Sequence, residues 1–238
     1  MPDQLLLQPS PDAPAPPPGE EALRSRRKMK WLIGVGIFSI VGLGLMLMIK
    51  KHRGRSMNVL SELAMDARQI GLALDAFDRV YGRYPDSSTI APVLKASGSR
   101  LTLGNGSSNA IFRQLMVTGI ATDETIFSAD TGPSTQPDNI FKTDATMLAN
   151  GECAFAYLPG FDSTCDWNTP LAFGPVIPGT TTLDSRTFGG KAVVLKRDMS
   201  VIAYPVTKAG KLMYGGMDLL DPRQPYWQGK PPDVKWPK

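Results

Sequence analysis

The chain has few of the residues that active sites and metal sites depend on. Its 238 residues include one histidine, His52, and two cysteines, Cys153 and Cys165. A structural zinc site needs four nitrogen or sulfur ligands, so these three residues are too few to build one. Hydrolases with a serine or cysteine nucleophile normally need a histidine base, and His52 is the single candidate.

Nucleotide-binding signatures are missing as well. Gly34 and Gly36 lie inside an apolar run, and Gly104 and Gly106 are not followed by the third glycine of a dinucleotide-binding turn. A serine activated by a lysine would be the remaining enzymatic alternative, and no motif supports it. We therefore expect a protein that is not an enzyme and has no cofactor and no metal site.

A long uncharged segment is the strongest positive signal. Residues 31–49 are 19 consecutive residues without a charge. As a helix they would span roughly 28 Å, which matches the hydrocarbon core of a bilayer. No small-residue cleavage site follows them, since the next residues are Lys50, Lys51, His52 and Arg53. The segment is therefore expected to be an uncleaved, membrane-spanning signal anchor, with the lipid bilayer as its partner.

Basic residues flank this segment on both sides. Five cations lie at positions 24–30 and four in a juxtamembrane collar at 50–56. The N-terminal side has one cation more than the C-terminal side, which favours a cytoplasmic N-terminus and an extracytoplasmic C-terminal domain. Residues 56–238 hold 17 of the 26 cations and 18 of the 22 acids, a net charge of −1. The excess of cations that gives the chain its basic pI of about 9.1 thus lies on the two sides of the expected membrane segment. No nucleic-acid partner is therefore expected.

The N-terminal segment 1–30 reads as a disordered tail. Its first 23 residues contain seven prolines and four acids, a composition typical of solvated, partly polyproline-II chain.

A strong helical periodicity begins after the collar. One apolar stripe recurs at alternating spacings of three and four residues between positions 57 and 81, and Gly82 and Pro85 end it. Such a stripe must be buried, either against the rest of the chain as a core element, which is favoured, or against sister copies. The stripe consists of Leu60, Leu63, Ala67, Ile70, Leu74, Phe77 and Tyr81.

The remainder of the chain reads as short elements separated by turns. Residues 108–120 predict a short helix ending at Gly119, and residues 153–158 predict a strand. Residues 192–195 and 201–204 predict a hairpin closed by the turn 197–200, and 129–146 predicts surface loops. Five prolines exclude a helix or a central strand in the segment 221–238, which we expect to be a strap on the domain 57–220. The fold class is α+β.

Two smaller features have alternatives. Cys153 and Cys165, 12 residues apart, would form a disulfide in an oxidising compartment or remain two thiols. The strap combines Tyr226, Trp227 and Trp236 with lysines, which suits stacking on sugars or bases, although packing on the domain is favoured.

The end of the periodic helix carries a family resemblance. Residues 66–85 run into Gly82, Arg83, Tyr84 and Pro85, which resembles the end of the long N-terminal helix in pseudopilins of type II secretion and related pilin-like proteins. Residues 166–170 are similar to part of the Asp-Pro-Trp-Gly-x-Pro signature of that family, and residues 190–201 to its closing hairpin. Residues 28–33 differ from the prepilin cleavage motif, in keeping with an uncleaved anchor.

The resemblance implies a long helix packed on a small antiparallel sheet, anchored in a bacterial inner membrane. The function it implies is that of a non-enzymatic structural or assembly component of an envelope or secretion-type system, with sister subunits or other pilin-like proteins as partners. Some pseudopilins bind calcium in their sheet loops, for which Asp162, Asp166 and Asp184 would be candidates; solvated loop acids are the favoured interpretation. The alternative function is a monomeric, membrane-tethered module that binds a protein or a polymer.

Overall fold

The computed structural model describes residues 59–131 and 134–238 of the chain. The tail 1–30, the expected membrane anchor 31–49, the collar 50–56 and the first residues of the domain lie outside the described residues. Within the described part, no helix is long and apolar enough to cross a membrane.

The described residues form an α+β fold, as expected. Its helices comprise residues 59–81, α2 (Ile90–Ser97) and α3 (Ser108–Val117), with two short 3₁₀ helices, η1 (Glu124–Phe127) and η2 (Pro225–Trp227). The antiparallel sheet has the order β1-β2-β3-β4, and a separate two-stranded hairpin follows. The strands are β1 (Ala156–Tyr157), β2 (Pro170–Gly174), β3 (Lys191–Lys196), β4 (Val201–Pro205), β5 (Met213–Tyr214) and β6 (Met217–Asp218).

The 59–81 helix supplies one wall of the main hydrophobic core. Five members of its apolar stripe are fully buried there, and Leu60 and Tyr81 pack against them at the two ends. The helix ends at Gly82, whose φ of 74° suits a residue without a Cβ and whose N–H donates to Asp78 O at 2.7 Å. The stripe is therefore buried against the rest of the chain, which is the alternative favoured from the sequence. Its buried members are Leu63, Ala67, Ile70, Leu74 and Phe77.

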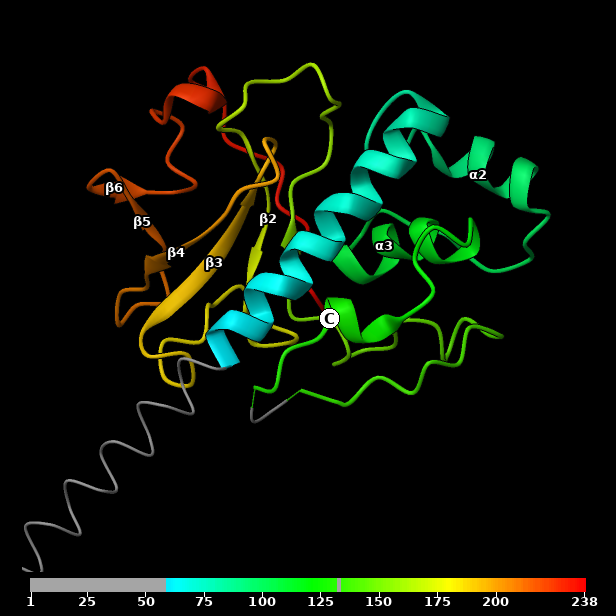
Figure 1. Ribbon diagram of the computed structural model, residues 1–238, viewed down its shortest axis with the longest axis horizontal. Helices are drawn as coiled ribbons and strands as arrows, with labels where there is room; N and C mark the ends of the chain where they lie inside the picture. The colour runs from blue at the N-terminus through cyan, green and yellow to red at the C-terminus, as the bar shows by residue number, and fades with distance from the viewer. Residues whose placement is uncertain (1–58, 132–133) are drawn as a thin grey trace, which may run out of the picture. The chain divides into compact units, whose positions relative to one another are not determined.

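The sheet has a different layer on each face. Val193 and Leu195 of β3 join the core that contains the 59–81 helix, whereas Ala192 and Val194 belong to a second core. This alternation follows from the two-residue period of a strand. In Figure 1 the helix crosses in front of the sheet, α2 and α3 lie on one side of it, and β5 and β6 lie at the opposite end of the domain.

The C-terminal segment closes the second core. Trp227 is buried and its indole N–H donates to Leu219 O at 2.8 Å, while Trp236 packs edge-on against Phe173 of β2. Lys235 pairs with Tyr157 of β1 in an isolated bridge. The aromatic side chains of the strap thus serve mainly as packing, the alternative favoured from the sequence.

Most predicted elements are present, with shifted bounds. The helix predicted at 108–120 is α3, capped at Ser107, whose side chain accepts from Ala110 N. The predicted hairpin is β3 and β4, paired from Lys191 with Pro205 to Leu195 with Val201. The strand predicted at 153–158 is shorter, since pairing with β2 covers Ala156 and Tyr157 alone.

Candidate functional site

The 59–81 helix has a second apolar row on its solvent side. Met65, Leu72 and Val80 are 66%, 59% and 69% exposed. At 100° per residue they fall on one side of the helix, opposite the buried stripe. Single exposed hydrophobic residues are normal, but three large ones on the same side of one helix, about two turns apart, mark that side as a candidate contact surface. We call these three residues the exposed row.

The family-like motif at the end of this helix, residues 82–85, is held in place by contacts with the rest of the domain. Tyr84 is buried and its N–H donates to Phe161 O at 3.1 Å. The Arg83 guanidinium pairs with Asp86 at 2.9 Å, and the Tyr157 hydroxyl donates to Pro85 O at 3.0 Å. Burial, followed by Cys165 and Asp78, raises the pKa of Tyr84 to about 12. These contacts give Gly82, Arg83, Tyr84 and Pro85 a structural role at the helix end.

The three acids considered for calcium do not form a cluster among the described residues. Each one stabilises its own turn: Asp162 accepts from Thr164 N, Asp166 from Asn168 N, and Asp184 from Arg186 N, all at 2.8 Å. Hydrogen bonds from Thr164 lower the pKa of Asp162. This is the geometry of ordinary loop acids.

A different acidic cluster, which sequence reasoning missed, joins the loops after α3. Carboxylate oxygens of Glu124, Asp138 and Glu152 lie within 4.8 Å of one another. Glu124 accepts from Leu148 N at 2.5 Å and Asn139 N at 3.0 Å, and Glu152 accepts from Ala149 N at 2.5 Å. Burial raises the pKa of both glutamates. Backbone N–H groups thus donate to both oxygens of Glu124 and to one oxygen of Glu152, and these hydrogen bonds connect the loop to η1.

The two cysteines are free thiols. Cys153 is buried, with Sγ 3.6 Å from Ser108 Oγ, and burial raises its thiol pKa to about 11. Cys165 is half-buried in the loop before β2. Of the two alternatives considered from the sequence, the structure therefore has two separate thiols and no disulfide between Cys153 and Cys165.

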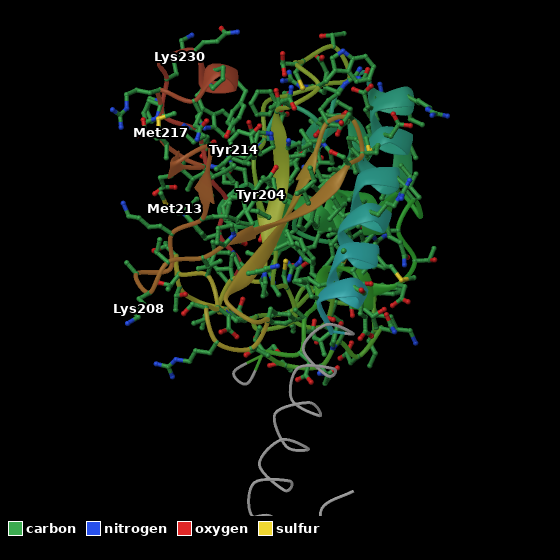
Figure 2. The ribbon with its side chains drawn as sticks, turned by 60° about the vertical axis from the view of Figure 1, so that its left-hand side comes forward. Tyr204, Lys208, Met213, Tyr214, Met217 and Lys230 are labelled. Atoms are coloured by element: carbon green, nitrogen blue, oxygen red, sulfur yellow. The ribbon has the colours of Figure 1, made fainter. Side chains whose placement is uncertain are left out.

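A second candidate surface, with a partly buried centre and exposed ends, lies on the side of β4, β5 and β6, and we call it the tyrosine–lysine face. Figure 2 shows Tyr204 and Tyr214 next to each other, with methionines and lysines along the outer rim. Their rings meet edge-on, with centroids 5.2 Å apart. The Lys196 ammonium lies 5.0 Å from the Tyr214 ring centroid. The surface comprises Lys196, Tyr204, Lys208, Met213, Tyr214, Met217 and Lys230.

An acidic cavity of about 250 Å³ opens beside the start of the described helix, lined by Glu62, Asp66 and Asp130 together with apolar Leu63 and Phe188. Burial, followed by the charges of Glu62 and Asp123, raises the pKa of Asp66 to about 6. This cavity was not predicted from the sequence, because the loop residues that line it lie more than 40 positions beyond the end of the helix.

Comparison with known proteins gives no family: no family model, no curated protein and no solved structure matches the chain.

Proposed function

We propose that this protein is a non-enzymatic, membrane-anchored, pilin-like assembly component whose copies contact one another through the exposed row of the 59–81 helix. The observation that carries the proposal is the position of Met65, Leu72 and Val80. They lie opposite the buried stripe, on the helix that follows the uncharged segment 31–49.

The physical argument rests on burial. The buried stripe is used within the domain, so the helix stays in place without a partner. Covering three large apolar side chains removes apolar surface from water, and each Å² removed contributes about 25 cal/mol of favourable free energy. Anchoring in one bilayer, as expected for segment 31–49, would hold the helices of neighbouring copies in the same orientation and raise their effective concentration.

Cysteine crosslinking in native membranes tests this proposal. Met65→Cys and Leu72→Cys are introduced singly into a chain in which Cys153 and Cys165 are replaced by alanine, and mild oxidant is added. The proposal predicts disulfide-linked dimers for both variants. Ala96→Cys, at an exposed position on α2, is the matched control and is expected to remain monomeric.

The tyrosine–lysine face favours a second function, a membrane-tethered module that binds a polymer. It lies on the sheet face opposite the 59–81 helix, since Tyr204 packs with the second core. The two functions therefore use different surfaces and are tested separately.

A further inference from the structure

The tyrosine–lysine face contains a largely buried lysine whose ammonium group has few partners. Lys196 is 6% exposed, and its Nζ makes one long hydrogen bond of 3.5 Å, to Asn168 Oδ1. The ammonium also faces the Tyr214 and Tyr204 rings, at 5.0 and 6.0 Å from their centroids, and its charge acts on the Asp198 carboxylate, although the two groups form no hydrogen bond or ion pair. An ammonium has three N–H donors, so two of them have no acceptor among the described residues.

The surroundings of Lys196 combine ring faces with positive charge. A third ring, Tyr226, lies 6.1 Å from Tyr214 and extends the row of aromatic side chains toward η2. Segment 204–230 holds four cations and two acids, whereas the whole region 56–238 has a net charge of −1. This segment therefore carries an excess of two positive charges in a domain whose overall charge is slightly negative.

Two of these cations are neutralised and two are not. Arg223 pairs with Asp221 at 2.6 Å, and Lys211 pairs with Asp218 at 3.5 Å. Lys208 and Lys230 enter none of the ion pairs found between described residues, and Figure 2 places them at opposite ends of the face, with Met213 and Met217 between them. An anionic ligand that contacts both ends must be extended.

We propose that the tyrosine–lysine face binds an acidic polysaccharide, with a uronate carboxylate on Lys196 and sugar rings on Tyr204 and Tyr214. A carboxylate would supply the acceptor that the Lys196 N–H groups lack, in a partly desolvated site where charge-assisted hydrogen bonds are strong. The C–H faces of sugar rings pack on tyrosine rings, and further carboxylates along the polymer meet Lys208 and Lys230.

The geometry favours this ligand over a single-stranded nucleic acid. Bases stack between or upon open parallel faces, whereas Tyr204 and Tyr214 meet at 86°. Phosphate recognition also favours the bidentate guanidinium of arginine, and the Arg223 guanidinium is held by Asp221. This inference rests on the second function, the polymer-binding module, and is independent of assembly through the helix.

The test uses the full chain in nanodiscs of phosphatidylcholine, which carry no net charge. Polygalacturonate is titrated into the protein by calorimetry, with neutral dextran and oligothymidine as comparison polymers. The proposal predicts that polygalacturonate binds most tightly and that Lys196→Met, which replaces the ammonium by an apolar group of similar length, weakens binding about tenfold. Tyr214→Leu weakens it in the same direction, and Lys95→Met on α2 leaves it unchanged.

The outcomes separate the site from the function. If none of the polymers binds, the binding-module function and this site both fail. If polygalacturonate binds equally to the wild type, Lys196→Met and Tyr214→Leu, the binding-module function is supported but this site is wrong. Tighter binding of oligothymidine than of polygalacturonate also overturns the proposal. Should Lys196→Met fail to fold, the surface variant Lys208→Gln with Lys230→Gln decides: unchanged affinity overturns the site, and weakened affinity supports it.

Discussion

Gly71 of the 59–81 helix packs directly against Leu195 of β3. A Cβ at position 71 would lie 2.9 Å from Leu195 Cδ1 and 2.9 Å from Met199 Sδ. The helix can therefore approach the sheet this closely because position 71 has no side chain. This contact fixes which side of the helix faces the sheet and, in consequence, which side carries the exposed row.

The effect of a substitution at Gly71 on the free energy of unfolding should depend steeply on the size of the new side chain. The atoms nearest to position 71 are the ends of flexible side chains, so the strain of Gly71→Ala is small and is offset by the helix propensity of alanine, about 1 kcal/mol above that of glycine. Gly71→Leu overpacks the interface and is expected to lower the free energy of unfolding by about 2–3 kcal/mol. Urea unfolding followed by tryptophan fluorescence measures both. Gln69→Leu on the exposed side is the control, and an equal loss there would contradict the packing argument.

Gly174 at the end of β2 is expected to tolerate no side chain. A Cβ there would lie 2.7 Å from Ala154 O, a backbone atom that cannot turn away. Gly174→Ala should therefore destabilise the fold by about 2 kcal/mol or more. Gly106→Ala is the matched control, since its Cβ would meet nothing within 4 Å, and it should be neutral or slightly stabilising. Thermal unfolding of both variants by circular dichroism checks the contrast, and equal melting temperatures would refute it.

Asp66 should make the domain less stable as the pH rises from about 4 to about 6. Its pKa is raised from 3.8 to about 6 by burial, Glu62 and Asp123, so the folded state holds a proton that the unfolded state has lost in this window. Because the group is half-exposed, solvent screening reduces the effect to about 1 kcal/mol. Asp66→Asn should therefore be more stable than the wild type at pH 7 and equal to it at pH 4.

Denaturant unfolding at several pH values measures this dependence. Glu62→Gln removes one of the two neighbouring charges and should shift the transition to lower pH without abolishing it. An Asp66→Asn variant that keeps the full pH dependence of the wild type would show that another group is responsible.

Glu124 should hold the loop 134–148 against η1. In Glu124→Gln the amide NH₂ group faces either Leu148 N–H or Asn139 N–H, so a donor meets a donor and one buried hydrogen bond is lost. We expect a loss of about 1–3 kcal/mol and faster proteolysis within this loop. Glu62→Gln, which lies outside this hydrogen-bond network, is the control, and equal cleavage rates in the two variants would argue against the role of Glu124.

The sequence predicts elements whose pattern is local. The 3.6-residue period of the helix ending at Tyr81 and the turn at Arg197–Ser200 were sufficient for the long helix and the β3–β4 hairpin. It does not predict β2, because Pro170–Gly174 is buried at every position and shows no alternation. It also misses α2, whose side chain at the N-cap position, Thr89, makes no capping hydrogen bond.

The candidate surfaces were harder to predict than the fold. The stripe from Leu60 to Tyr81 was recognised, but the row of Met65, Leu72 and Val80 is mixed with charged residues such as Arg68 and Arg79. It becomes visible once burial separates the two sides of the helix. The tyrosine–lysine face joins residues from β3 to η2 that no spacing rule connects, since tertiary packing alone brings Lys196 to Tyr214.

A cysteine scan along the 59–81 helix tests the central claim most directly. Single cysteines at each position, in the cysteine-free chain in native membranes, are oxidised and the dimer fraction is measured. Assembly through the exposed row predicts maxima at positions 65, 72 and 80 and minima at the buried positions 63, 70 and 74. A dimer fraction that shows no helical period, or is no higher at 65, 72 and 80 than at Ala96 of α2, would contradict the account.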